Sequence, residues 1–132
     1  ENSYASNYRQ EVLNLVNAER AKYGLKPLAM GDAKLTAAAQ QRAEEIATVN
    51  SHVRPIGTKW YTVLSEYGVT DAAAGENAAW GSVSPEEVVN AWMNSEGHRA
   101  NILDPEARAM GVGYYYNSSS TWGHQWIQLF TK

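Results

Sequence analysis

The chain contains no cysteine. Thiol catalysis, zinc sites built from cysteine and disulfide bonds are therefore excluded, and cysteine usage gives no information about the redox compartment. No apolar stretch approaches the roughly 20 residues that a membrane-spanning helix needs, so we expect no transmembrane segment. The chain also lacks a basic run and has a formal net charge of −3, which argues against a nucleic-acid partner.

The sequence has no signal peptide and opens at Glu1 rather than Met, as expected of a processed or trimmed piece. Its 132 residues predict one domain, residues 1–132, because a typical domain takes roughly 100–200 residues. A hydrophobic fraction of 44% is enough for a core without disulfides. Phenylalanine is scarce, with one residue against five Trp and eight Tyr. Because Trp and Tyr carry a polar end, we expect some of them to line a wet groove.

Helical and β-prone segments alternate along the chain. Helical spacing and capping residues predict helices over residues 7–23, 32–51 and 58–67, and a fourth helix that Ser84 caps and Gly97 interrupts. Aromatic and β-branched segments predict a strand over residues 75–81 and an antiparallel hairpin from residues 110–116 and 122–130. This order predicts an α+β fold in which helices cover a small antiparallel sheet.

Three histidines provide the candidate chemistry: His52, His98 and His124. His52 follows the end of a predicted helix, and His98 lies in a glycine-containing loop just past the capped helix. Glu76 lies within the predicted strand, where a carboxylate needs a partner or water. Two imidazoles from His52 and His98 and the Glu76 carboxylate would give zinc three protein ligands and leave one position open for water or substrate.

Other interpretations compete with this metal site. Each of these histidines can equally be a loop residue with a satisfied hydrogen bond, and His124, between two tryptophans, is expected to be structural. The sequence has no His-Glu-x-x-His motif and no Gly-x-Ser-x-Gly elbow, so zincin and serine hydrolase chemistry lack support. Tyr114–Tyr116 can form a carbohydrate or lipid platform, or an ordinary strand whose alternate rings are buried.

Five motifs occur in an order that is similar to one known family. They are Ser51-His52-Val53-Arg54-Pro55, Gly75-Glu76-Asn77, the stretch from Trp92 to Leu103, Met110-Gly111-Val112-Gly113 and the stretch from Trp126 to Phe130. Together they resemble the CAP superfamily (cysteine-rich secretory proteins, antigen 5 and pathogenesis-related 1 proteins), also called SCP domains, from about Val12 to Phe130. The absence of cysteine resembles the branch found in secreted bacterial proteins.

The resemblance implies an α-β-α sandwich with a small antiparallel sheet between helical layers. It also implies a water-accessible cleft holding His52, Glu76 and His98, with zinc or another divalent metal as the candidate cofactor on these three residues. Ser95 stands in this cleft where many relatives have a second glutamate, so three ligands are expected rather than four. Ile56 stands where the family usually has an aspartate, which removes a carboxylate near the cleft.

Three functions remain open on these grounds. The first is a secreted protein, extracellular or associated with the cell wall, whose His/Glu cleft binds a divalent metal or a small ligand, including a lipid or sterol. The second is a cell-envelope interaction module that binds lipid or glycan through its aromatic surface. The third is a protease-like hydrolase with Glu76 or a histidine as general base. The sequence shows no nucleophile or oxyanion signature, and it leaves open whether the chain is an enzyme.

Overall fold

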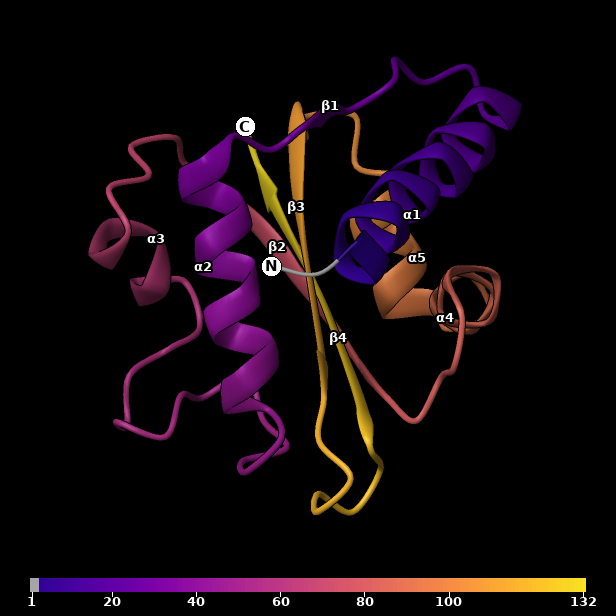
Figure 1. Ribbon diagram of the computed structural model, residues 1–132. Helices are drawn as coiled ribbons and strands as arrows, with labels where there is room; N and C mark the ends of the chain where they lie inside the picture. The colour runs from indigo at the N-terminus through magenta and orange to yellow at the C-terminus, as the bar shows by residue number, and fades with distance from the viewer. Residues whose placement is uncertain (1–2) are drawn as a thin grey trace.

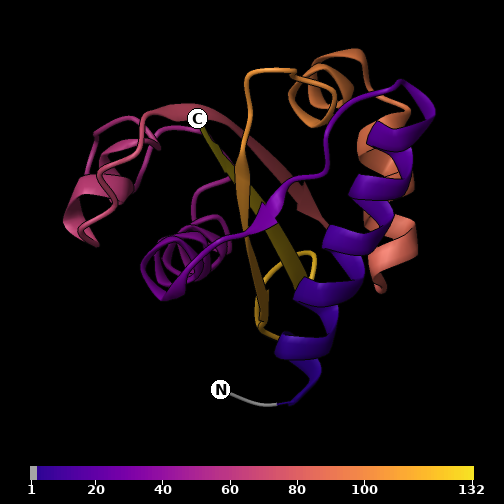
Figure 2. The same cartoon turned by 90° about the horizontal axis from the view of Figure 1, so that it is seen from above.

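The computed structural model describes residues 3–132, in which helices lie on both faces of one sheet (Figure 1). One face is covered by α2 (Ala33–Glu45) and α3 (Thr62–Glu66). The other carries α1 (Ser3–Lys22), α4 (Pro85–Met93) and α5 (Glu96–Ile102). The view from above shows the same separation of the two helical layers (Figure 2). The α+β class and the α-β-α sandwich are therefore confirmed.

The sheet has four strands in the order β1-β3-β4-β2. They are β1 (Ala29–Met30), β2 (Ala73–Trp80), β3 (Ala109–Tyr116) and β4 (His124–Thr131). Strands β3 and β4 form the predicted antiparallel hairpin, and β2 pairs antiparallel with the other side of β4. The short strand β1 pairs parallel with β3 and was absent from the sequence prediction, because two residues are too few to show a β period.

Capping residues account for several helix ends. Asp32 caps α2 by accepting a hydrogen bond from Leu35 N at 2.9 Å, and Ser84 caps α4 by accepting one from Glu87 N at 3.2 Å. Gly24 follows α1 with a φ of 72°, a left-handed conformation that glycine adopts without strain. These three predicted boundaries are confirmed.

Two helices are shorter than predicted. Helix α2 ends at Glu45, because tight turns follow in which Thr48 N and Val49 N both donate to Glu45 O, at 3.1 and 3.0 Å. Helix α3 begins at Thr62 rather than near residue 58, since the segment before it forms a small hairpin in which Arg54 N donates to Thr58 O at 2.7 Å.

The region after Ser84 contains two helices rather than one. Helix α4 ends at Met93, and α5 starts after Ser95, its N-cap residue. The break falls at Asn94 and Ser95, residue types whose side chains compete with helical hydrogen bonding and favour helix ends. His98 therefore lies on a helix, and its predicted place in a loop is wrong.

Two buried clusters fill the spaces on the two sides of the sheet. On the side of α1, the indoles of Trp92 and Trp126 are buried and donate to Ala78 O at 3.1 Å and to Ser82 O at 2.7 Å. On the side of α2 the helix lies very close to β3, since a Cβ added to Gly113 would fall 2.1 Å from the carbonyl oxygen of an alanine on α2. Small residues on both elements thus set the distance between this layer and the sheet.

No helix within residues 3–132 combines the length and the apolar character that crossing a bilayer requires.

Gln40 on α2 closes the edge of β3 beyond the end of β1. Its Nε2 donates to Tyr114 O at 2.8 Å, and its Oε1 accepts from Tyr114 N at 3.1 Å. The side-chain amide therefore pairs with the strand as another peptide unit would. An open strand edge is a template for pairing with other chains, so Gln40 shields this edge at one residue.

Replacing Gln40 with Leu should leave both backbone groups of Tyr114 without this partner. Because an unsatisfied buried donor or acceptor costs roughly 1–3 kcal/mol and Tyr114 is half-buried, we expect the free energy of unfolding in urea to fall by about 1–2 kcal/mol. Gln10→Leu is the control, because Gln10 is exposed on α1; its effect should stay within about 0.5 kcal/mol. Equal unfolding midpoints for the two variants would contradict the role of Gln40.

Candidate functional site

A buried arginine on α2 organises the region of the predicted cleft. Arg42 is 0% exposed, and its guanidinium contacts Glu76 on β2 twice, from Nε to Oε2 at 2.7 Å and from Nη2 to Oε1 at 3.0 Å. The same group donates to Glu45 at 2.9 Å and to Ser51 O at 2.9 Å. Two parallel bonds between planar groups fix the orientation of both. The Glu76 carboxylate is therefore held in one position by a cation that keeps its proton in proteins.

His52 is the next residue in this network. Its Nδ1 lies 2.7 Å from Glu76 Oε1, and since a carboxylate accepts hydrogen bonds, this nitrogen carries the proton. In the neutral ring the lone pair is then on Nε2. The His52 side chain is 56% exposed whereas that of Glu76 is fully buried. An accessible imidazole is thus oriented by an inaccessible carboxylate.

His98 belongs to the opposite helical layer. Asn77 Nδ2 donates to His98 O at 3.0 Å, and Asn101 Nδ2 donates to Asn77 Oδ1 at 2.9 Å, so two amides hold α5 against β2. Successive residues on a strand point to opposite faces, which directs Glu76 toward α2 and Asn77 toward α5. The two histidines therefore flank β2, the outermost strand on this side of the sheet, from opposite layers.

The pKa values of the two histidines shift in opposite directions. The hydrogen bond to Glu76 raises the pKa of His52 above its usual value near 6.5, although burial and Arg42 oppose this shift. Burial lowers the pKa of His98, and the positive charge of His52 lowers it further. At pH values between the two pKa values, His52 is protonated while His98 is neutral.

The third predicted metal ligand, Glu76, already has partners. One of its oxygens accepts from Arg42 alone, and the other accepts from both Arg42 and His52. In the part of the chain that the structure describes, no group of three or more His, Cys, Asp or Glu side chains is arranged to hold a metal ion. Imidazole nitrogens are chemically suited to divalent metals, and Glu76 orients one of the two rings, while the site of three ligands stays a prediction.

A second buried arginine, Arg54, anchors the loop that carries His52. Arg54 is 4% exposed and donates to Glu45 Oε2 at 2.7 Å and to Glu66 Oε2 at 2.6 Å. Burial alone would raise the pKa of Glu45, but hydrogen bonds from Arg54, Arg42 and Gln41 outweigh it and lower this pKa to about 2. The loop is thus tied to α2 and α3 through charged groups.

Ser95 and Ile56 complete the set of residues singled out in the sequence. Ser95 is half-buried at the start of α5, and among the described residues it makes no side-chain capping bond to that helix. Its place in the cleft stays a prediction. Ile56 lies in the turn of the His52 loop and is 66% exposed, so an apolar side chain faces water where the family usually has a carboxylate.

Sequence reasoning missed the two arginines that position the site. Arg42 had a usable signal, because it falls on the stripe of α2 formed by Leu35, Ala38, Ala39 and Ala43, all of which are buried. A charged residue on an otherwise apolar helix face must have a buried partner of opposite charge. Arg54 lies in a loop without periodicity, so the sequence held no comparable signal for its burial.

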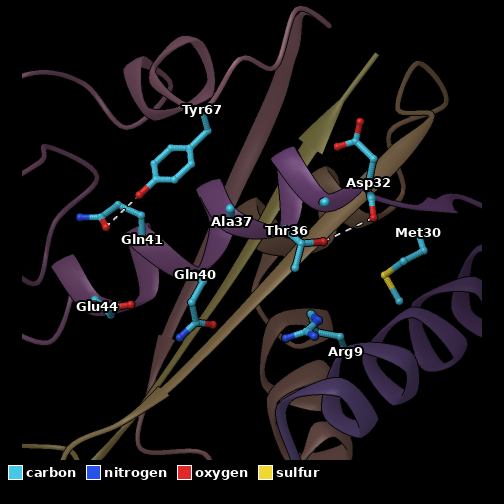
Figure 3. A pocket seen from close by; sticks show the side chains of 11 residues that line it. Arg9, Met30, Asp32, Thr36, Ala37, Gln40, Gln41, Glu44 and Tyr67 are labelled. Atoms are coloured by element: carbon cyan, nitrogen blue, oxygen red, sulfur yellow. Dashed lines mark hydrogen bonds between the residues drawn. The ribbon is translucent and has the colours of Figure 1, made fainter. Parts of the chain in front are cut away.

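A separate pocket of about 690 Å³ lies on the β1 side of the sheet, opposite to β2 (Figure 3). Its lining includes Arg9 of α1, Met30 of β1 and one face of α2. At one end the Tyr67 hydroxyl donates to Gln41 Oε1 at 3.1 Å. None of the histidines lines this pocket, so it is distinct from the site around His52.

Comparisons with known proteins agree with the fold. A family model described as "CAP: Cysteine-rich secretory protein family" matches residues 13–130. The uncharacterized protein YkwD of Bacillus subtilis (strain 168) is 43% identical over 127 residues, which cover 95% of this chain and 49% of YkwD. The chain therefore spans about half the length of this curated relative.

Two solved structures share the architecture. An extracellular protein containing a SCP domain from Bacillus anthracis has a TM-score of 0.84 and 27% identity, covering 97% of this chain and 41% of the other. An outer surface protein of Borrelia burgdorferi has a TM-score of 0.80 and 22% identity, covering 93% of this chain and 90% of the other. At 22% identity the second likeness shows the fold alone.

The low pKa of Glu45 predicts a loss of stability in acid. Because its folded pKa of about 2 lies below the ordinary value of 4.5, ionised Glu45 stabilises the fold above pH 4.5, and this contribution is lost as the pH falls toward 2. In Glu45→Gln the free energy of unfolding should fall by ~2 kcal/mol at pH 6 and match the wild type near pH 2. Glu44→Gln, on an exposed neighbour, should show no such pH dependence.

NMR titration of the imidazole resonances will measure the opposite histidine shifts. We expect a pKa above 6.5 for His52 and below 6.5 for His98, because one ring faces a carboxylate and the other is half-buried beside a cation. Glu76→Gln should lower the pKa of His52, because the ring then loses its charged hydrogen-bond acceptor. Indistinguishable pKa values for His52 and His98 would contradict the geometry.

Proposed function

The chain belongs to the cysteine-rich secretory protein (CAP) family, and from that premise we propose that it is a secreted CAP domain whose His52 and His98 bind a divalent metal ion reversibly. The observation that carries the proposal is the 2.7 Å contact between His52 Nδ1 and Glu76 Oε1. A histidine held by a carboxylate through one nitrogen presents the other nitrogen as a metal ligand with fixed orientation. Because both oxygens of Glu76 already accept hydrogen bonds, the proposal gives Glu76 the role of orienting His52.

The number of protein ligands sets the expected strength of binding. Structural zinc sites use four protein ligands and catalytic ones typically three. With two imidazoles, the ion would bind weakly, exchange readily and keep positions for water or for a small ligand. A bound zinc ion would supply Lewis-acid chemistry at this position. The half-exposed His52 gives such a ligand access from solvent.

The protonation states of His52 and His98 determine how strongly the proposed site can bind a metal ion. A metal ion needs neutral imidazoles, and the lowered pKa of His98 favours its neutral form at neutral pH. The raised pKa of His52 makes protons compete with the metal at that ring. Binding is therefore expected to strengthen as the pH rises from 6 to 8.

Secretion is the second part of the proposal. It is supported by the description of the structural relative with 27% identity, an extracellular protein containing a SCP domain. A site that depends on two exposed or half-buried imidazoles also suits an environment where free divalent metal is available. The activity of the longer proteins that contain such domains is not implied by this one domain.

Zinc titration by calorimetry at pH 7.5 tests the metal site. We expect binding by the wild type and by His124→Ala, and at least tenfold weaker binding by His52→Ala and by His98→Ala, because each removes one of two ligands. His124→Ala is a matched control, since it deletes an imidazole bonded to Tyr114 instead. Equal affinities in all four proteins, or no binding by the wild type at 1 mM zinc, would exclude the proposal.

A further inference from the structure

The tip of the β3–β4 hairpin carries two exposed aromatic side chains. Tyr116 is 55% exposed and Trp122 is 56% exposed. A Cβ added to Gly81, in the loop after β2, would lie 3.7 Å from Trp122 Cε3, so this loop is adjacent to the tip. The same loop contains Val83, which is 55% exposed. Figure 1 shows the hairpin turn extending beyond the helical layers, at the end of the sheet away from the C-terminus.

The exposed Tyr116 ring is held in place rather than loose. The ring centroid of Tyr116 lies 4.8 Å from that of His124, and His124 Nδ1 lies 2.7 Å from the Tyr114 hydroxyl. The Tyr114 ring in turn packs at a tilt against the buried Trp126 ring, with centroids 4.6 Å apart. A Cβ added to Gly123 would lie 3.4 Å from Tyr116 Cε1, so this ring also packs on the backbone. A ring fixed before binding loses little entropy when a ligand stacks on it.

The hairpin is also free of formal charge. From Met110 to Thr131 the sequence contains no Asp, Glu, Lys or Arg. The turn supplies hydroxyl and amide groups instead, from Asn117 and from a serine and threonine run whose members Ser118, Ser119 and Thr121 are exposed. Such a surface offers no positive charge to the phosphates of a membrane or to an acidic peptide. It suits an uncharged partner with flat apolar faces and many hydrogen-bonding groups.

We propose that this hairpin tip, formed by Tyr116, Trp122, Val83 and the polar groups of residues 117–121, binds an uncharged glycan. The C–H face of a sugar ring stacks on an aromatic ring, and the sugar hydroxyls at its rim bond to side-chain hydroxyls and amides. The tip is separate in sequence and in chemistry from the His52 site. Its binding therefore needs neither a metal nor the His52 and His98 imidazoles and does not rest on the proposed function.

Titration of the full chain with chitohexaose, cellohexaose and maltohexaose, all uncharged, tests the proposal by calorimetry and tryptophan fluorescence. We expect one or more of these probes to bind, with Trp122→Ala and Tyr116→Ala each weakening that binding by about tenfold through loss of a stacked ring. Tyr116→Phe keeps the ring and should stay within about twofold of the wild type. Tyr23→Ala is the matched control, since Tyr23 is 61% exposed and follows α1.

Three outcomes would overturn the proposal. These are no binding of any of the three oligosaccharides at 10 mM, equal affinity in the wild type and in both alanine variants, and equal weakening by Tyr23→Ala. Sedimentation with phosphatidylglycerol vesicles runs in parallel. Binding to vesicles without binding to sugar would identify a membrane surface instead and would also overturn it. Thermal unfolding of each variant confirms that it is folded.

Discussion

The site depends on the buried ion pair between Arg42 and Glu76. One guanidinium joins a helix, a strand and a loop, because it contacts Glu76 on β2, Glu45 on its own helix and the carbonyl of Ser51 at 2.9 Å. Removing one member of such a pair leaves an uncompensated charge in the interior, which costs several kcal/mol. The ion pair with Arg42 fixes the position of the Glu76 carboxylate. It thereby also places a negative charge beside the His52 ring.

The alternation of a single strand explains how the segments that carry the two histidines are attached to the sheet. Glu76 and Asn77 are consecutive, so their side chains point to opposite faces of β2, and each engages the helical layer on its own face. Because β2 is the outermost strand, the layers are not separated there by a further strand. Groups from both layers can then approach one another around the strand. A shift of one residue in the register of β2 would turn these two side chains to the opposite faces, and the contacts of Glu76 with Arg42 and of Asn77 with α5 would be lost.

The sequence predicted the elements whose signals are local. The caps at Asp32 and Ser84 and the β3–β4 hairpin depend on residues that are neighbours along the chain. It failed at the split between α4 and α5, where it placed the interruption at Gly97 instead of Asn94 and Ser95, and at the strand β1, which is too short to show a β period. The histidines and Glu76 were singled out by residue type and by family resemblance. The two arginines that position them were not singled out. Arg54 lies in a loop, and its burial depends on acidic partners that only the fold brings close to it.

The two edges of the sheet and the turn of the β3–β4 hairpin carry different side chains. In each place the backbone is not paired with a further strand. At the edge of β3, Gln40 supplies a substitute peptide group to Tyr114, so that margin is closed. At the edge of β2, the side chains of both layers supply ionisable groups instead. At the turn of the hairpin, no helix covers the strand ends, and the residues there are aromatic and uncharged. The same central sheet can thus support three separate roles. The edge of β3 is protected from pairing, the edge of β2 carries groups that titrate, and the hairpin turn presents an uncharged surface.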